Sequence, residues 1–427
     1  MIDLRLIRES PNDVRAALAR RGGKAGGILE AVLRRDEERR ELLQRAEKLK
    51  AERNRASEEV ARRKREQVDA AELIAQLKGV SDTIKQLDQQ VRAVEEALEE
   101  QMLLLPNLPL PDLPEGDESA NAVVRSWGEA PSFDFVPKPH WELGEALGLL
   151  DLARGAKISG SGFPLFTGMG AKLTRALVNF MIDLHTSEHG YVEVGPPYLV
   201  NRNAARGTGQ IPDLEHNMYV TEDGLYLIPT AEVPVTNLHA EEILKADALP
   251  RGYVAYTPCF RREAGAHGKD TRGLIRVHQF DKVELVRFCE PAASPAEHEK
   301  LLGHAEAVLQ RLEIPYRVVL LAAGDVGFAS AKTYDLEVWA AGVEAWLEAS
   351  SASTFTDFQA RRANIRYRPQ PDAKPAFVHT LNASGVALPR TIIALLENNQ
   401  EEDGSVRVPG ALVPYLGTDR LTPGEGA

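Results

Sequence analysis

The residues best suited to chemistry lie in two runs, TPCFRRE (257–263) and GLIRVHQFDKVELV (273–286), which are separated by a loop rich in glycine and charge. If both runs are strands, their side chains alternate between two faces. One face of the second run would then carry Arg276, His278, Phe280, Lys282 and Glu284, opposite the apolar Ile275, Val277, Val283 and Leu285. Arginine suits phosphate, a ring suits a base, and a carboxylate suits an amine or hydroxyl, so this face could bind a nucleotide. A hairpin with a merely solvated face fits the composition equally well.

Polar residues in three other runs could belong to the same site. In LYLIPTAEVPVTNLH (225–239), Thr230 and Glu232 follow an expected strand, Leu225 to Ile228, and could simply cap a helix. In WLEASSASTFTDFQARR (346–362), Glu348 interrupts a strand-like run, and the serines after it could cap the next helix. In HTLNASGVALPRTIIALLENN (379–399), a strand is expected to lead into a helix with Pro389 in its first turn. Arg390 then opposes the helix macrodipole, which stability alone explains poorly.

Together these runs resemble the signature motifs of class II aminoacyl-tRNA synthetases, in the form typical of the seryl-tRNA synthetase family. FRRE, the loop and GLIRVHQFDKVE are similar to motif 2, and the run around Arg390 is similar to motif 3. HGYVEVGPPYLVN (189–201), with Pro197, has the spacing of motif 1, the dimer-interface segment. The resemblance extends over nearly the whole chain.

The resemblance implies a role for each candidate residue. Arg261 and Arg390 would be catalytic, with the adenine between Phe280 and Arg390. The serine substrate would meet Thr230, Ala231, Glu232, Glu284 and Ser384. ATP would meet Arg261, Arg262, Glu263, Arg276, Val277, Phe280, Glu348, Ala349, Ser350, Ser351 and Arg390. Mg²⁺ would be held by Glu348 and Ser351 together with the nucleotide.

Some positions depart from the family pattern. Arg262 stands where serine is common, and strand alternation would turn it away from the nucleotide. Ala352 replaces a common cysteine, which argues against a thiol metal ligand, and no structural zinc is expected. Thr354, Ala383 and Pro389 also depart from common residues. None of these changes removes an expected phosphate, adenine or ammonium ligand.

A helical hairpin is expected near the N-terminus. Apolar residues recur at alternating spacings of four and three from Leu73 to Leu98, and a similar rhythm runs from Leu42 to Val60 with Arg53 interrupting it. Such spacing is typical of a coiled-coil seam. A reversal between Arg65 and Ala70 would let the two helices pair as antiparallel arms roughly 45–50 Å long.

The expected tip of this arm is basic, with Arg62, Arg63, Lys64 and Arg65 in succession. A charge run on a coiled coil is commonly a solvated face. It could also grip a phosphate backbone. The family uses such an arm to hold the long variable arm of its tRNA, so the resemblance favours the second interpretation.

Three parts are expected: a helical domain with the arm (1–103), a proline-rich extended linker (104–128) and a catalytic domain (129–427). The expected fold class is α+β, with the antiparallel coiled-coil arm followed by an antiparallel sheet flanked by helices. The family acts as a homodimer.

The bulk properties favour a cytoplasmic protein. No apolar run approaches the ~20 residues that span a bilayer, and MIDLRLIRES lacks a secretory signal, so no membrane contact is expected. Two cysteines, Cys259 and Cys289, exclude a disulfide framework and are expected to be buried thiols. The formal charge of −12 leaves any RNA contact to a local basic patch.

The expected activity is ATP-dependent activation of L-serine and its transfer to tRNA(Ser), and also to tRNA(Sec) where that tRNA exists. Two alternatives remain open at this stage. One is a paralogue that passes an activated amino acid to a carrier protein, although such proteins usually lack the long arm. The other is a non-catalytic RNA-binding relative, which would be expected to lose Arg261, Glu348 or Arg390, all of which are present.

Overall fold

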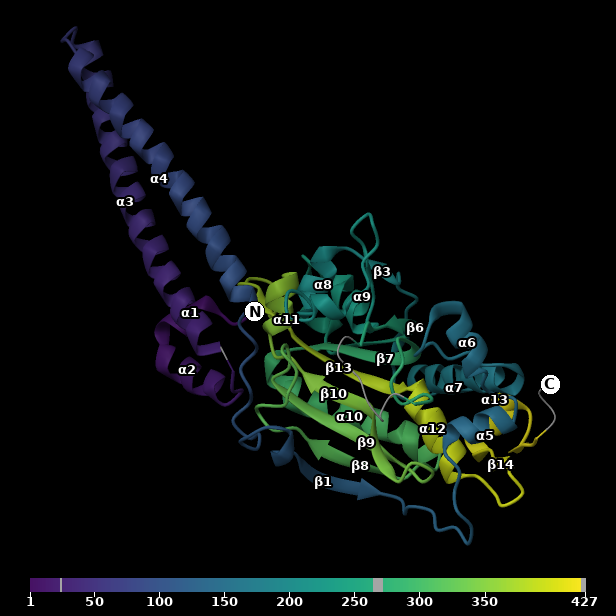
Figure 1. Ribbon diagram of the computed structural model, residues 1–427. Helices are drawn as coiled ribbons and strands as arrows, with labels where there is room; N and C mark the ends of the chain where they lie inside the picture. The colour runs from purple at the N-terminus through teal and green to yellow at the C-terminus, as the bar shows by residue number, and fades with distance from the viewer. Residues whose placement is uncertain (24, 264–271, 424–427) are drawn as a thin grey trace. The chain divides into compact units, whose positions relative to one another are not determined.

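The computed structural model describes residues 1–23, 25–263 and 272–423 (Figure 1). They form two compact units, Ile2–Pro106 and Asn107–Ala427. Within the described residues, no helix combines the length and apolar character needed to cross a bilayer.

The first unit is entirely helical. Two short helices, α1 (Leu4–Glu9) and α2 (Pro11–Ala19), precede the long antiparallel pair α3 (Ala25–Arg65) and α4 (Ala71–Leu103). The reversal lies at residues 66–70, as expected from the sequence. Seam residues near the base are buried, namely Ala46, Ile84, Leu87, Val91, Val94 and Leu98, whereas Leu73 and Leu77 near the tip are only half-buried. The coiled-coil prediction is therefore confirmed, with its tightest packing away from the tip.

The second unit is built on an eight-stranded sheet with the order β1-β8-β9-β10-β13-β7-β6-β2. The strands are β1 (Ala122–Trp127), β2 (Val192–Glu193), β6 (Arg251–Phe260), β7 (Gln279–Cys289), β8 (Tyr316–Leu320), β9 (Lys332–Ala340), β10 (Ala345–Thr354) and β13 (His379–Ala387). All neighbouring pairs are antiparallel except β2 and β6. The predicted α+β class with an antiparallel sheet is confirmed.

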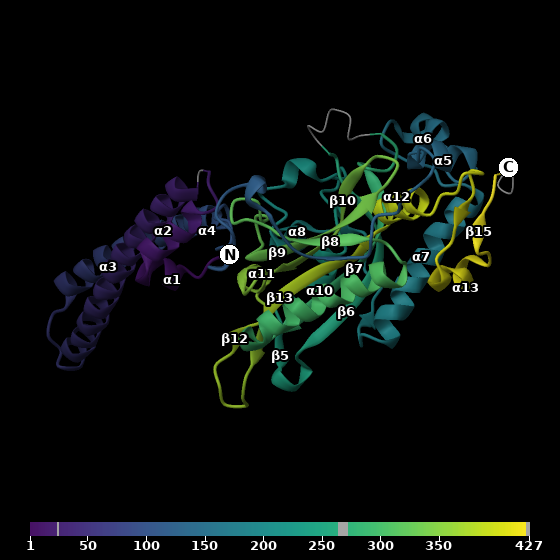
Figure 2. The same cartoon turned by 90° about the horizontal axis from the view of Figure 1, so that it is seen from below.

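One face of this sheet is covered by the helices α7 (Gly168–Ser187), α10 (Ser294–Arg311) and α12 (Leu388–Asn398) (Figures 1 and 2). They share one apolar core with every second residue of the central strands, for example Leu336 and Val338 on β9. Alternation turns the intervening residues, such as Asp335 and Glu337, to the other face. That face carries the polar side chains of the site.

Smaller elements surround the sheet. The helices are α5 (His140–Ala146), α6 (Leu152–Ser159), α8 (Arg202–Thr208), α9 (Glu232–Thr236), α11 (Phe358–Ala363) and α13 (Val413–Leu416). The short strands are β3 (Leu199–Val200), β4 (Tyr226–Leu227), β5 (Ile243–Lys245), β11 (Arg366–Arg368), β12 (Ala376–Phe377), β14 (Val406–Arg407) and β15 (Arg420–Leu421).

Two local expectations differ from the structure. Most of the segment expected to be a free linker belongs to the second unit: Asn107 donates hydrogen bonds to the carbonyls of Ala329 (2.9 Å) and Phe355 (2.8 Å), and β1 pairs with β8 at the sheet edge. An edge position tolerates the flanking prolines that a central strand would not. The second run of the motif 2 hairpin becomes a strand only at Gln279, so residues 272–278 form an irregular segment.

Candidate active site

The motif 2 hairpin brings an arginine and a ring together. Phe260 at the end of β6 pairs with Gln279 at the start of β7, so Arg261 and Phe280 lie side by side. The Arg261 guanidinium is 5.2 Å from the centre of the Phe280 ring. The Arg261 N–H donates to the His278 carbonyl (2.8 Å), and its Nε donates to the Pro229 carbonyl (3.3 Å). The arginine is thus oriented from both ends before any substrate contact.

A cavity of about 240 Å³ opens beside this pair. Residues expected at the nucleotide line it, namely Arg261, Glu263, Arg276, Val277, Phe280, Glu348, Ala349 and Arg390. Phe280 and Arg390, which come from β7 and from the first turn of α12, therefore bound one space. Residues 272–278 are irregular, and Ile275 and Val277 both line this cavity. Ile275 also packs against the apolar core that contains Val283, as strand alternation had suggested.

Ion pairs connect the charged side chains of this cavity. Arg276 Nη1 lies 3.2 Å from Glu263 Oε2, and Arg390 Nη1 lies 3.3 Å from Glu348 Oε2. Arg390 Nη1 also donates to the Glu348 carbonyl, and its Nε donates to the Ile275 carbonyl at 3.5 Å. The two arginines are therefore held over the cavity by partners that a triphosphate could replace.

A bulge in β10 explains how Glu348 and Ser351 reach the same site. Cross-strand partners run Glu348 to Glu337 and then Ser350 to Leu336, so Ala349 is an extra residue. Three positions apart on a regular strand, Glu348 and Ser351 would face opposite sides. With the bulge, both line a second cavity of about 430 Å³. Ser350 instead turns inward, and its hydroxyl donates to the Ser384 carbonyl (2.6 Å).

Of the five residues expected around the amino acid, Thr230, Glu232 and Ser384 line this second cavity, whereas Ala231 and Glu284 do not. The cavity is also lined by Lys282 and Asn382, and it shares Arg261, Glu263, Lys282, Glu348 and Ser384 with the first cavity. The two cavities are thus parts of one cleft. Ala231 is fully buried beneath it in the apolar core, and Thr230 Oγ1 accepts the Glu232 N–H at 3.2 Å, as the capping interpretation predicted.

Glu232 lines the second cavity, and Asn382 links it to Glu284, which is completely buried and lines neither cavity. Glu232 Oε1 accepts a hydrogen bond from Gln359 Nε2 (2.6 Å), and the Asn382 amide donates to both Glu232 (3.2 Å) and Glu284 (2.8 Å). Lys282 pairs with Glu284 and donates to Thr230 Oγ1 at 2.8 Å. Burial, followed by the charge of Glu284, raises the pKa of Glu232 to about 7. A bound cation would stabilise the ionised form of this carboxyl and lower its pKa.

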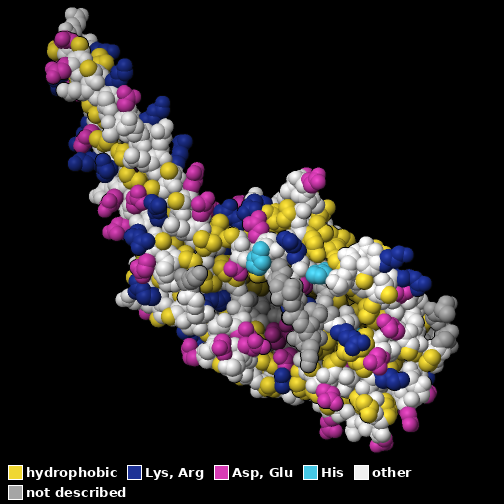
Figure 3. Space-filling view, in the orientation of Figure 1, with side chains coloured by type: hydrophobic (Ala, Val, Ile, Leu, Met, Phe, Trp, Pro, Cys, Tyr) yellow, Lys and Arg dark blue, Asp and Glu magenta, His cyan; other side chains and the backbone are white. Residues whose placement is uncertain are grey.

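Acidic side chains continue beyond this cleft. Figure 3 shows Asp and Glu side chains gathered on the visible face of the second unit, and a wide, open cavity there is lined by Asp325, Asp335, Glu337, Glu348 and Ser351. Among the residues that the structure describes, no group of three or more His, Cys, Asp or Glu side chains has the geometry to hold a metal ion by itself. A divalent ion at Glu348 and Ser351 would therefore depend on oxygens of the nucleotide, as is usual for Mg²⁺.

The remaining expected residues are Arg262 and the four basic residues of the arm tip. Arg262 lines neither cavity of the cleft; its guanidinium lies 3.4 Å from the His216 carbonyl, as the alternation argument suggested. At the arm tip, Arg62 and Arg63 pair with Glu59 at 2.9 and 3.0 Å, and Arg62 keeps 61% of its side chain exposed. Lys64 and Arg65 are also exposed.

The chain matches two family models. The seryl-tRNA synthetase N-terminal domain covers residues 1–109, and the class II tRNA synthetase core domain (G, H, P, S and T) covers residues 218–399. A serine–tRNA ligase of Geotalea uraniireducens is 55% identical over 419 residues, 98% of this chain and 99% of that protein. One of Carboxydothermus hydrogenoformans is 54% identical over 423 residues, 99% of each. This chain belongs to the seryl-tRNA synthetase family.

Solved structures agree with this assignment. The seryl-tRNA synthetase of Pyrococcus horikoshii complexed with ATP has a TM-score of 0.95 at 40% identity. The match includes 99% of this chain and 100% of that chain. The serine–tRNA ligase of Naegleria fowleri in complex with AMP has a TM-score of 0.88 at 29% identity, with 99% of each chain covered. The protein is therefore an aminoacyl-tRNA synthetase of class II.

Sequence reasoning left the half-buried Asn382 and the buried Gln359 of this synthetase unassigned. Asn382 bridges both carboxylates and could have been found, because it shares a strand face with Ser384 two positions later. No sequence pattern around Gln359, on α11, predicted that it belongs to the site. Gln359 reaches Glu232 only because α11 packs against α8 and β13, which no pattern within its own helix indicates.

Proposed function

We propose that this synthetase activates L-serine with ATP and transfers it to tRNA(Ser), and also to tRNA(Sec) where that tRNA exists. The observation that carries the proposal is the single cleft in which Arg261, Phe280 and Arg390 meet a buried pair of carboxylates. One end suits a nucleotide and the other an ammonium group, with Arg261 at the junction of both.

In the first step, a serine carboxylate oxygen attacks the α-phosphorus, and the bond from that phosphorus to the bridging oxygen of pyrophosphate breaks. Arg261 holds the α-phosphate, Arg276 the outer phosphates and Glu263 the adenine edge, with the base between Phe280 and Arg390. Glu348 and Ser351 would hold Mg²⁺, which supplies positive charge to the phosphate oxygens. The carboxylate is already a nucleophile, so rate depends on alignment and charge stabilisation, without a dedicated general base.

In the second step, a hydroxyl of the terminal tRNA ribose attacks the acyl carbon of seryl-adenylate, and AMP leaves. Thr230, Glu232 and Glu284 hold the ammonium, and Ser384 contacts the hydroxyl of serine. Alanine has the ammonium but lacks the hydroxyl, so it would leave the partner of that hydroxyl unpaired, which is a basis for rejecting it. The helical arm binds tRNA, and the enzyme works as a homodimer.

Pyrophosphate exchange across a panel of amino acids tests the proposal. Serine is expected to support exchange, whereas alanine and threonine are expected to support little. Charging of tRNA(Ser) is then measured with the same preparation. Exchange without charging would favour a carrier-protein ligase, and the absence of exchange would favour a non-catalytic relative. The match of residues 1–109 to the family's N-terminal domain supports the tRNA-dependent enzyme over both.

A further inference from the structure

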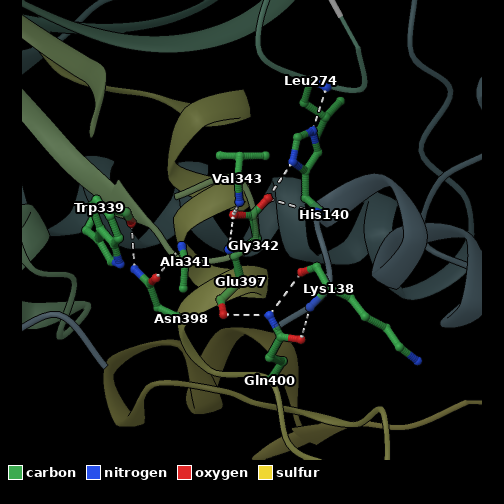
Figure 4. Close-up of polar contacts among 10 residues, drawn as sticks. All are labelled: Lys138, His140, Leu274, Trp339, Ala341, Gly342, Val343, Glu397, Asn398 and Gln400. Atoms are coloured by element: carbon green, nitrogen blue, oxygen red, sulfur yellow. Dashed lines mark hydrogen bonds and ion pairs between the residues drawn. The ribbon is translucent and has the colours of Figure 1, made fainter. Parts of the chain in front are cut away.

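The end of α12 holds three other segments together. Arg390 lies in the first turn of this helix, and Glu397, Asn398 and Gln400 lie at or just beyond its last turn (Figure 4). Glu397 is completely buried, yet its Oε2 accepts hydrogen bonds from the backbone N–H groups of Gly342 (2.8 Å) and Val343 (3.1 Å). These two residues lie in the turn that leads into β10, the strand that carries Glu348.

The second oxygen of Glu397 is used by His140, at the start of α5. Oε1 accepts from the His140 backbone N–H at 2.8 Å and lies 2.7 Å from ring Nδ1. The His140 ring has no exposed surface. Four donors thus converge on one carboxylate, which satisfies a buried charge that would otherwise be costly.

The far side of the His140 ring points to the nucleotide cavity. Its Nε2 accepts the backbone N–H of Leu274 at 2.9 Å (Figure 4). Because Nε2 accepts, the ring proton must be on Nδ1, where it is donated to Glu397. Leu274 lines the first cavity, as do the next three residues, Ile275, Arg276 and Val277. The neutral His140 ring therefore connects the Glu397 carboxylate to the Leu274 backbone by a hydrogen bond at each ring nitrogen.

Two further contacts hold the same stretch of backbone. Gly273 has φ +68°, and a Cβ added there would lie 2.2 Å from His140 Nε2, so the ring and the backbone are in close contact. The Arg272 guanidinium lies 4.6 Å from the ring centre of Trp141, the neighbour of His140 on α5. The first turn of α5 thus holds residues 272–274 by three separate contacts.

We propose that His140 and Glu397 form a positioning pair for ATP: they set the backbone of residues 274–277 in register with Arg390 and Glu348. Neither residue lines the cleft, so both act through other residues. The pair joins α12, the turn before β10 and the motif 2 segment, which carry Arg390, Glu348 and Arg276. This inference rests on the proposed function, because it assumes that the first cavity holds the nucleotide.

The test compares two replacements of His140 that differ in which ring nitrogen they imitate. His140→Gln can place its amide oxygen near the position of Nε2 and still accept from Leu274. His140→Asn reaches only the position of Nδ1, so it can donate to Glu397 but leaves the Leu274 N–H without an acceptor. The expected result for His140→Asn is a KM for ATP raised about tenfold, the effect of one lost buried hydrogen bond, with the KM for serine within about twofold.

Asn398→Ala is the matched structural control. Asn398 accepts from the Ala341 N–H (3.2 Å) and donates to the Trp339 carbonyl (2.7 Å), so it holds the same turn without reaching Leu274. This variant is expected to lower Tm while leaving the KM for ATP unchanged. His140→Gln is expected to lie closer to wild type than His140→Asn in ATP binding.

Direct calorimetric titration with ATP accompanies the exchange kinetics and separates two kinds of failure. Absence of serine-dependent exchange by the wild type would contradict the proposed function, while the ATP titration would still test the positioning pair. Equal KM values for ATP in wild type and His140→Asn, with a lowered Tm, would reduce the pair to a structural role and overturn the inference. If His140→Asn does not fold, Glu397→Gln is measured in the same way and is expected to weaken ATP binding selectively.

Discussion

Glu232 illustrates how a single buried side chain can couple binding to pH. Its carboxyl has 7% exposure, and burial beside Glu284 raises the pKa from the ordinary 4.5 to about 7. A carboxyl with a raised pKa contributes most to the stability of the free protein below its ordinary value, and that contribution is lost as pH rises toward 7. A bound ammonium reverses this preference, because it favours the ionised carboxyl.

The KM for serine should therefore rise as pH falls below about 7, approaching tenfold per pH unit, since a proton on Glu232 must be released before the ammonium binds. Pyrophosphate exchange kinetics between pH 6 and 8 measure how the KM for serine depends on pH. Glu232→Gln should raise the KM for serine by roughly 10- to 100-fold, the effect of losing a charge-assisted hydrogen bond, and flatten its pH dependence. A wild-type KM that is constant over this range would contradict the assignment.

Arg390 is expected to act on ATP with little effect on folding. It is 27% exposed and contacts mainly Glu348 and the Ile275 carbonyl, so truncation leaves no buried cavity. Arg390→Ala should lower kcat/KM for ATP in exchange about 100-fold, the scale of losing one charge-stabilising donor.

Tm and molecular mass of Arg390→Ala should remain those of wild type. Arg390→Lys is the control, because it keeps the charge but loses the planar group that can stack on adenine, and it should recover only part of the activity. Wild-type exchange by Arg390→Ala would show that the motif 3 assignment is wrong.

At the scale of elements, residue spacing predicts the structure of the arm better than that of the sheet. In α3 and α4 the heptad spacing alone indicates the pairing, because each apolar seam packs mainly against the other. In β10 the spacing is misleading, since the bulge at Ala349 changes which residues share a face. Glu348 and Ser351 become neighbours only through this irregularity.

Removing the arm should separate the two half-reactions. Deleting residues 34–96 and joining the helix stumps by a short turn should leave serine-dependent exchange within about twofold of wild type. The kcat/KM for tRNA charging should fall at least about 100-fold, because several phosphate contacts are lost together.

A milder change to the arm replaces Arg62, Arg63, Lys64 and Arg65 by alanine. This variant should also weaken the salt dependence of tRNA binding. Equal losses in both reactions would contradict an arm devoted to RNA.

At the scale of the whole molecule, apolar side chains remain exposed around the segment that resembles motif 1. Val192, Tyr198, Leu199 and Val220 are 44–51% exposed, and β3 and β4 form a small separate sheet among them. Exposed apolar groups that gather in this way favour an interface with another protein surface. A second copy of the chain is the partner that the family resemblance implies.

The protein should therefore have a solution mass of twice 46.9 kDa by sedimentation or light scattering. Leu199→Asp should shift the population toward monomer and lower exchange activity, since an unpaired charge would be placed in the interface. Glu402→Lys, on the exposed turn between Glu401 and Gly404 and outside this group of residues, serves as a charge-changing control that should stay dimeric. A monomeric wild type with full activity would exclude the dimer as a requirement.

Elements with a local signal can be predicted from the amino-acid sequence. The helical arm and its turn, the helix after Pro389, the α+β class and the identity of most residues in the cleft follow from spacing, caps and motif resemblance. These features depend on neighbours within a few turns of the chain, so periodicity and propensity reveal them.

The tertiary structure alone decided how distant segments meet. The contact of Gln359 with Glu232, the edge strand β1 and the His140–Glu397 link to Leu274 all join residues far apart in the chain. The bulge that unites Glu348 with Ser351 is visible only in the pairing of β10 with β9. The contacts between distant residues arise because buried polar groups must find partners, and the partner available depends on which segments pack together. No local pattern in the sequence carries that information.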